Sequence, residues 1–316
     1  MRGRRLVLIL AIALTLSLVF LFAVLRERDQ FHLFTGARAG SDRPVFLAGL
    51  SGSSDTSLRQ PMRAVVDGDG LIYISDTGNH RVAVFDDTGK PVRFIGVPGV
   101  GPGQINYPYG LAFRQNGNLL VADSANLTVS EFTRNGEFVG LFIRKDQGYK
   151  PGDMTSDGQG LLYISDLANH QVVVTGDDGR VVRTIKNPDQ TVSYPQGLAV
   201  DGAGRLWVAD SGNYQLKLFD QEGHPLRTLT GAEDGKEKFS MVRGLALDKR
   251  GRLYVADSLA GRVRAFDAEG KELFSFGEPG HEKGQFTYPM GLYVDAQDRI
   301  YVADRGNDRI QIWGYR

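Results

Sequence analysis

The chain has 316 residues, with 37 basic side chains, 37 acidic side chains and no cysteine. Without cysteine there is no disulfide, no thiolate nucleophile and no cysteine-ligated zinc. Five arginines and two acids lie within the first thirty residues, so 32 basic and 35 acidic side chains remain in the rest of the chain. This near-neutral remainder does not have the positive charge typical of a nucleic-acid-binding surface, and we expect no nucleic-acid partner.

The N-terminal segment has the pattern of a membrane anchor. A basic segment, residues 1–5, precedes an apolar run of twenty uncharged residues, residues 6–25. At about 1.5 Å per residue, this run would cross a hydrocarbon core of ~30 Å. The positive-inside rule places residues 1–5 in the cytoplasm and the rest of the chain on the extracytoplasmic side, in the periplasm or at the cell exterior. We expect an uncleaved signal anchor, with a cleaved signal peptide as the alternative, followed by a linker over residues 26–43.

The remainder, residues 44–316, contains six copies of one strand–turn–strand pattern. Two copies, YISDTGNHRVAVF from Tyr73 and WVADSGNYQLKLF from Trp207, show two short alternating segments on either side of a polar turn. This pattern is typical of a β-hairpin. An aspartate ends the first strand of each copy, and successive aspartates are 47, 43, 44, 47 and 47 residues apart. A period in this range predicts one β-propeller blade per copy, and hence six blades.

The two ends of this region are expected to meet in one blade. The last copy reaches residue 316 just after its third strand, so its outermost strand has to come from elsewhere. The sequence FLAG at residues 46–49 resembles FIG at residues 94–96, the last strand of another copy. We therefore predict that the segment near Pro44–Leu47 closes the ring on the last blade. The expected fold class is all-β, a six-bladed propeller of four-stranded antiparallel blades, preceded by one N-terminal transmembrane helix.

The repeats resemble those of the NHL-repeat family of six-bladed propellers. A proline ahead of the inner strand, a VAD or ISD strand end, an SGN or TGNHR turn and a Phe-Asp closing turn recur among the copies. The linkers GPGQ at residues 101–104 and KGQF at residues 283–286 each lead to Tyr-Pro, as in that family. The resemblance implies the fold. Family members include RNA-binding, protein-binding and receptor-kinase sensor domains and a peptide-amidating lyase, so function has to be argued from the site.

The six recurring aspartates are interpreted as structural residues. One occurs in each blade, so they cannot converge on one ion, and a carboxylate at a turn readily accepts backbone N–H bonds. His80 and His170 also recur at one position of the repeat, and we interpret them as surface-loop residues. The aspartates are Asp76, Asp123, Asp166, Asp210, Asp257 and Asp304.

The residues expected at the mouth of the central channel are not histidines. Fourteen residues before each aspartate the chain has Met62, Tyr109, Gly152, Gln196, Arg243 and Met290. The resemblance implies that the lyase of this fold holds zinc through histidines converging on the channel. We therefore expect no catalytic residue, no metal ligand and no cofactor. The alternative is a metal-dependent lyase or hydrolase with one divalent metal ion in the central channel.

One residue further along, Arg63 and Asp153 replace the glycine of the other four copies. A concave mouth with a few convergent polar groups is the default binding site. The candidate ligand- or partner-binding residues are Met62, Arg63, Tyr109, Asp153, Gln196, Arg243 and Met290. An open alternative is that Arg63 and Asp153 only pair with each other or are solvated. Glu131 is a second exception to the repeat, because the equivalent position of the other copies holds an apolar residue. A glutamate there requires a partner or an exposed edge.

Together these features predict a membrane-anchored, extracytoplasmic propeller that serves as a binding, scaffold or sensor module. Its partner would be another envelope protein or an exported ligand, recognised by one rigid face of the ring. The metal-dependent enzyme is the second hypothesis.

Overall fold

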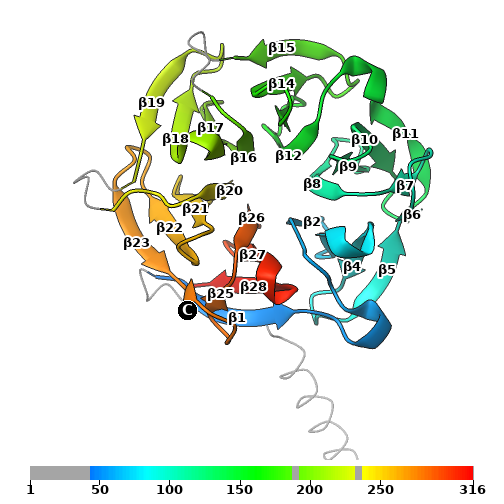
Figure 1. The fold of residues 1–316 in the computed structure, drawn as a ribbon, viewed down its shortest axis with the longest axis horizontal. Coiled ribbons are helices and arrows are strands. Elements are labelled where there is room, and N and C mark those ends of the chain that lie inside the picture. The colour runs from blue at the N-terminus through cyan, green and yellow to red at the C-terminus, as the bar shows by residue number, and fades with distance from the viewer. Residues whose placement is uncertain (1–42, 187–191, 232–236, 316) are drawn as a thin grey trace, which may run out of the picture. The chain divides into compact units, whose positions relative to one another are not determined.

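The structure is a computed structural model, and it describes residues 43–186, 192–231 and 237–315. In these residues, six four-stranded antiparallel sheets are arranged around a common centre, as Figure 1 shows in the view along the ring axis. The predicted six-bladed, all-β propeller is therefore confirmed. In five of these sheets the strands pair in sequence order from the centre outward, and in the sixth the N-terminal strand is outermost.

The blades take their strands from the chain as follows. Blade one has β2 (Ala64–Val66), β3 (Ile72–Asp76), β4 (Arg81–Phe85) and β5 (Pro91–Ile95); blade two has β8 (Pro108–Phe113), β9 (Leu119–Asp123), β10 (Thr128–Phe132) and β11 (Phe138–Ile143). Blade three has β12 (Pro151–Ser156), β13 (Leu162–Asp166), β14 (Gln171–Thr175) and β15 (Val181–Ile185); blade four has β16 (Pro195–Val200), β17 (Leu206–Asp210), β18 (Gln215–Phe219) and β19 (Pro225–Leu229). Blade five has β20 (Val242–Leu247), β21 (Leu253–Asp257), β22 (Arg262–Phe266) and β23 (Glu272–Phe276); blade six has β26 (Pro289–Val294), β27 (Ile300–Asp304), β28 (Arg309–Gly314) and β1 (Val45–Leu50).

Short elements lie between the blades and in the turns within them. The linkers predicted from GPGQ and KGQF form two parallel strand pairs, β6 (Val97–Pro98) with β7 (Gln104–Ile105) and β24 (Glu278–Pro279) with β25 (Gln285–Phe286). The helices among the described residues are 3₁₀ turns of three residues: η1 (Ser54–Thr56), η2 (Thr77–Asn79), η3 (Lys145–Gln147), η4 (Ser211–Asn213) and η5 (Arg305–Asn307).

Blade six is closed by the N-terminal strand. β1 pairs antiparallel with β28, from Val45 opposite Gly314 to Leu50 opposite Ile310, and Figure 1 shows the blue strand beside the red one. The Phe46 ring packs edge-on against Trp313, with 6.0 Å between ring centroids. The closing strand predicted near Pro44–Leu47 is confirmed, and it pairs what would otherwise be a free edge of β28.

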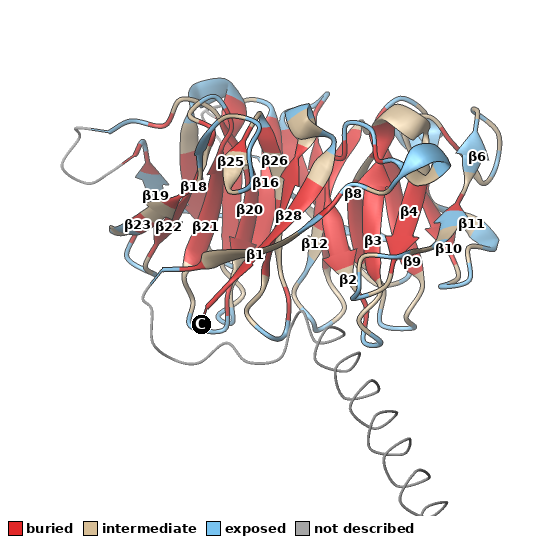
Figure 2. Cartoon of the chain, turned by 90° about the horizontal axis from the view of Figure 1, so that it is seen from below, coloured by how far each residue is buried: buried red, intermediate tan, exposed pale blue. Residues whose placement is uncertain are grey.

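The core consists of the middle strands of the blades, which Figure 2 shows buried along most of their length in the side view. One large aromatic side chain, three residues before the recurring aspartate, is buried in most blades, as in Tyr73, Trp207 and Tyr254. Apolar side chains of neighbouring blades share single clusters, for example Phe276 of blade five with Trp313 of blade six. The apolar contact between sheets therefore continues from blade to blade around the ring.

Glycine allows the inner strands to touch at four of the six seams between blades. A Cβ on Gly197 would lie 2.2 Å from the Arg243 carbonyl oxygen, and a Cβ on Gly244 would lie 2.2 Å from that of Met290. Gly110 and Gly291 approach the next blade in the same way. At the seams between blades one and two and between blades three and four, this position belongs to Arg63 and Asp153, so two side chains enter the centre of the ring.

The predicted anchor, residues 6–25, and the predicted linker up to residue 42 lie outside the described residues. Among the residues that the structure does describe, no helix has the length and apolar character to cross a membrane.

Candidate binding site at the channel mouth

The central channel is crossed by an ion pair. Arg63, just before β2, and Asp153 on β12 lie with Nη1 of Arg63 2.8 Å from Oδ2 of Asp153, and both side chains are more than nine-tenths buried. The same carboxylate oxygen accepts the backbone N–H of Leu198 on β16 at 3.2 Å. The pair therefore links blades one, three and four, and it holds the seam at which Asp153 replaces glycine.

Burial is the largest influence on the pKa of Asp153. Burial raises the pKa of the Asp153 carboxyl above its ordinary value, and the Arg63 guanidinium and two backbone N–H groups offset this only in part. Nε of Arg63 and Oδ1 of Asp153 have no hydrogen-bond partner among the described residues. Because these two polar groups are buried and already unsatisfied, we expect the stability of the fold to be sensitive to the loss of either Arg63 or Asp153.

Above the ion pair the ring opens into a cavity of about 480 Å³, which we call the bowl. Five of the seven candidate residues line it: Met62, Tyr109, Gln196, Arg243 and Met290. Arg63 and Asp153 lie one residue deeper along the inner strands and line a small cavity beneath, together with the same five residues. The structure thus brings the seven candidates together at one end of the channel.

Seven further residues line the bowl that sequence reasoning missed: Tyr107, Tyr194, Met241, Ser258, Leu259, Tyr288 and Arg305. Four of these directly precede the first residue of an inner strand, as Tyr288 precedes Pro289 and Met241 precedes Val242. The Tyr-Pro pairs were visible in the sequence as part of the repeat. Their convergence was not, because it depends on how the ring places segments that are distant along the chain.

Two rim tyrosines have a strained backbone. Tyr194 and Tyr288 each have φ 53°, a left-handed conformation that a bulky residue rarely adopts. Their side chains remain 39% and 51% exposed, respectively, at the edge of the bowl. Deeper inside, the Tyr109 hydroxyl donates to Oε1 of Gln196, and burial raises the pKa of Tyr109. The wall therefore combines fixed polar groups with accessible aromatic faces.

The six recurring aspartates lie away from the bowl, buried at the ends of the second strands. Each carboxylate accepts a backbone N–H from the segment that leads into its own inner strand, as Asp76 does from Arg59 at 2.7 Å and Asp210 from Ser193 at 2.6 Å. Asn169 and Gln171 also donate side-chain N–H groups to Asp166. In this geometry each aspartate connects the segment before the inner strand to the hairpin of the same blade through hydrogen bonds.

Two histidines, His80 and His170, make contacts between blades. His80 contacts the carbonyl oxygen of Asn106 through Nδ1, and Nδ1 of His170 accepts the backbone N–H of Tyr194 at 2.9 Å. His32 lies outside the described residues. Neither His80 nor His170 lines the bowl.

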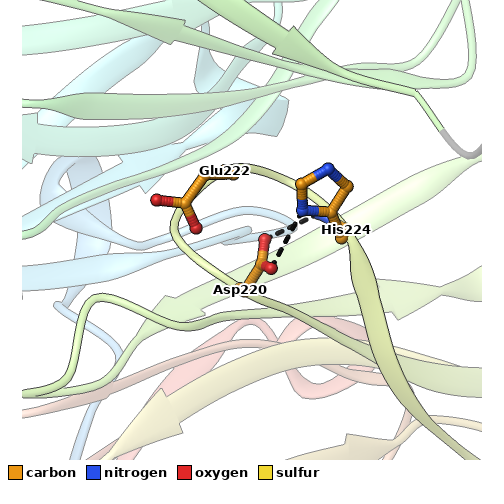
Figure 3. A group of neighbouring side chains, drawn as sticks. All are labelled: Asp220, Glu222 and His224. Carbon is orange, nitrogen blue, oxygen red and sulfur yellow. Dashed lines mark hydrogen bonds and ion pairs between the residues drawn. The ribbon is translucent and has the colours of Figure 1, made fainter.

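One group of potential metal ligands occurs among the described residues, Asp220, Glu222 and His224. Figure 3 shows that all three lie on a single turn, between β18 and β19, and that the marked contacts join Asp220 and His224. Asp220 accepts the backbone N–H of His224 at 2.7 Å, and its second oxygen lies 3.0 Å from Nδ1 of the ring. These contacts are those of a turn stabilised by an aspartate, far along the blade from the channel.

Glu131 has its partner within the chain. Both of its carboxylate oxygens contact Nη1 of Arg114, at 2.9 and 2.8 Å, and Oε1 also accepts from Asn118 at 2.7 Å. Arg114 in turn pairs with Asp177 of blade three at 2.9 Å. A charged network between blades two and three thus explains why a glutamate occupies a repeat position that is otherwise apolar, and no external partner is needed.

The sequence comparisons agree with this architecture. The family model described as "NHL repeat" matches residues 58–85, 192–219 and 286–313, which include the hairpins of blades one, four and six. The chain is an NHL-repeat β-propeller. This NHL propeller is 38% identical over 91 residues to the RING finger protein nhl-1 of Caenorhabditis elegans, across 28% of the chain and 9% of that protein. It is 25% identical over 136 residues to the protein brain tumor of Drosophila melanogaster, across 42% of the chain and 13% of that protein.

The similarity of the NHL propeller to these relatives is restricted to a small part of them. The matched regions cover 9% and 13% of the two proteins, so the activities of the whole relatives do not transfer to this chain. Among solved structures, a streptogramin B lyase superposes with a TM-score of 0.59 at 14% identity, over 81% of this chain and 79% of that one. A gluconolactonase from Xanthomonas campestris superposes with a TM-score of 0.63 at 16% identity, over 89% of this chain and 92% of that one. At such identities the likeness concerns the fold.

Proposed function

We propose that this NHL propeller is a membrane-anchored, extracytoplasmic recognition module that binds its ligand or partner at the channel mouth. The observation that carries the proposal is the bowl, a cavity of about 480 Å³ on one face of a rigid ring. Cavities of roughly 300–1,000 Å³ with apolar walls and a few polar groups are typical of ligand sites. The buried ion pair of Arg63 and Asp153 lies beneath the bowl, at a second small cavity that these two residues line.

The composition of the wall supports recognition. Tyrosine and methionine side chains, such as Tyr288 and Met290, supply contact area that adapts to a partner, while Arg243 and Gln196 supply directional polar groups. The partner proposed is another envelope protein or an exported ligand.

The location is proposed from the N-terminal sequence. Residues 1–5 are basic and residues 6–25 are uncharged, which favours an anchor with its N-terminus in the cytoplasm. Because the chain has no cysteine, a single Asp87→Cys variant on an exposed turn of blade one offers one labelling site. We expect a membrane-impermeant maleimide to label it in intact cells. Labelling that requires lysis would contradict an extracytoplasmic propeller.

Recognition at the bowl is tested by site-specific photo-crosslinking in the native host. A photoreactive phenylalanine replaces Tyr288 at the rim in one variant and Val182, an exposed residue on the outer strand of blade three, in the control. We expect a discrete adduct from position 288 and none of the same mass from position 182. Adducts of equal yield from both positions, or none from position 288, would contradict binding at this face.

Metal content provides an independent test. Purified without chelator, the protein should hold no stoichiometric divalent ion. Near one equivalent of tightly held zinc or calcium would overturn the recognition proposal in favour of a metal-dependent lyase or hydrolase.

A further inference from the structure

We propose that the ligand of the bowl carries a carboxylate on an apolar, aromatic-sized body, and that Arg243 binds this carboxylate. The proposal rests on the proposed function and specifies its ligand chemistry. The shared chemistry has two sources, the free carboxyl terminus of a peptide and a small aromatic acid.

Arg243 is a half-buried cation that has no counterion in the part of the chain that the structure describes. It lies on β20 at the wall of the bowl, and its Nη2 contacts the sulfur of Met241 at 3.1 Å. No carboxylate of the described residues lies within ion-pair distance of Arg243, whereas the buried arginines Arg63 and Arg264 both have acidic partners. A guanidinium that is partly removed from water and unpaired is stabilised by an incoming anion.

The charged residues that are described in the lining of the bowl are all positive. Among the described residues, its lining includes a second arginine, Arg305 on η5, and no acidic residue. Arg305 donates to the neutral Oε1 of Gln60 at 2.8 Å, which leaves its charge uncompensated. The acid nearest the floor, Asp153, is already paired with Arg63. An anion is therefore attracted to this cavity, and a divalent cation would meet two positive groups.

The walls favour an apolar body over a polyanion. Tyr194 and Tyr288 expose ring faces at the rim, and Met62, Met241 and Met290 provide polarisable, adaptable surface. A nucleic acid requires several phosphate contacts along a basic groove, and the described lining of the bowl offers two guanidinium groups. A planar guanidinium binds a carboxylate through two parallel hydrogen bonds. A guanidinium beside aromatic and methionine side chains therefore favours a ligand with one carboxylate joined to one apolar group.

The experiment is calorimetric titration of the full-length protein with matched pairs of acid and amide. N-acetyl-tryptophan and N-acetyl-tryptophanamide represent a peptide terminus, and 2-naphthoate and 2-naphthamide represent a small aromatic acid. A single-stranded oligouridylate represents nucleic acid. We expect at least one acid to bind about tenfold or more tightly than its amide, and the tighter-binding pair identifies the source.

Two variants test whether Arg243 makes the contact with the carboxylate. Arg243→Gln should lower the affinity for the acid about tenfold or more and leave the amide unchanged. The control Arg144→Gln, at an exposed arginine that pairs with Asp146, should leave both affinities unchanged. Unchanged unfolding midpoints in both variants show that the ring is intact.

The outcomes separate this inference from the proposed function. Equal binding of acid and amide, no binding of either acid, no effect of Arg243→Gln, or tighter binding of oligouridylate would each overturn the carboxylate inference. If the Tyr288 crosslink nevertheless forms, recognition at the mouth stands and its ligand has another chemistry. If the crosslink is also absent, the proposed function fails as well.

Discussion

Arg63 and Asp153 meet in the centre of the ring, with 2.8 Å between Nη1 and Oδ2, although ninety residues separate them in the sequence. They are the two residues that replace glycine at the innermost position of the repeat. Both side chains are buried below the bowl, and the pair joins blades one and three, which are not neighbours in the ring.

Removing one member of this pair should cost more stability than removing both. Asp153→Leu leaves the Arg63 guanidinium buried and unpaired, which we expect to lower the free energy of unfolding by about 3–5 kcal/mol. The double variant Arg63→Met, Asp153→Leu replaces the pair with apolar groups and should lose much less. Denaturant unfolding of the parent, Asp153→Leu, Arg63→Met and the double variant gives the coupling free energy between the two residues. Additive losses would show that the two residues act independently.

The four glycine seams predict a sharp contrast within blade four. Gly197→Ala would place a Cβ 2.2 Å from the Arg243 carbonyl oxygen, whereas a Cβ on Gly202 has nothing within 4 Å. We expect Gly197→Ala to destabilise the ring by about 1–3 kcal/mol, because the blades must move apart. Gly202→Ala should stay within about 0.5 kcal/mol of the parent. Equal stability of the two variants in denaturant unfolding would contradict the close packing of the inner strands.

Closure of the ring can be followed through one fluorophore. The chain has two tryptophans, so Trp207→Phe leaves Trp313, which packs against Phe46 of the closing strand with 6.0 Å between ring centroids. In that background, Phe46→Ala should expose Trp313 to water, shift its emission to longer wavelength and cost about 1–3 kcal/mol.

The control for ring closure is Val182→Ala, on the outer strand of blade three, which should not change the emission of Trp313. If Phe46→Ala also leaves the emission unchanged, β1 does not cover Trp313 in solution.

Alkaline pH should weaken the fold through buried tyrosines. Burial raises the pKa of Tyr73 from 10.0 to about 12, with a further contribution from Asp67, whose carboxylate accepts the Tyr73 hydroxyl at 3.1 Å. Because the pKa in the folded state lies above that of the unfolded chain, the contribution to stability is complete below pH 10 and is lost as the pH rises towards 12.

The measurement is the slope of unfolding free energy against pH in the range from 10 to 12 that the shift of Tyr73 defines. Tyr73→Phe should make the slope shallower, and Asp67→Asn should move the phenolate absorbance transition of Tyr73 to lower pH. The other tyrosines with a raised pKa are Tyr109, Tyr163, Tyr254, Tyr293, Tyr301 and Tyr315, so a slope remains in each variant. An identical slope in parent and Tyr73→Phe would contradict the prediction.

Much of the architecture was predictable because it is local and repeated. The period of the aspartates specified the number of blades, and each aspartate lies at the end of a second strand as its alternating pattern indicated. The incomplete last repeat and the FLAG segment at residues 46–49 predicted the closing strand, since an unpaired edge needs a partner. The seven mouth candidates were found from two adjacent positions of the repeat, because equivalent positions in equivalent blades face the same axis.

The tertiary structure alone decided what these residues do together. Sequence spacing could not show that Arg63 and Asp153 reach each other across the ring, or that Glu131 pairs with Arg114. Nor could it show that Tyr194, Tyr288 and Arg305 complete a bowl around Arg243. The repeat determines the blade, because its strands and turns are contiguous in the chain. The site depends on six blades that converge on one axis, so its distances and unpaired charge exist only once the ring is closed.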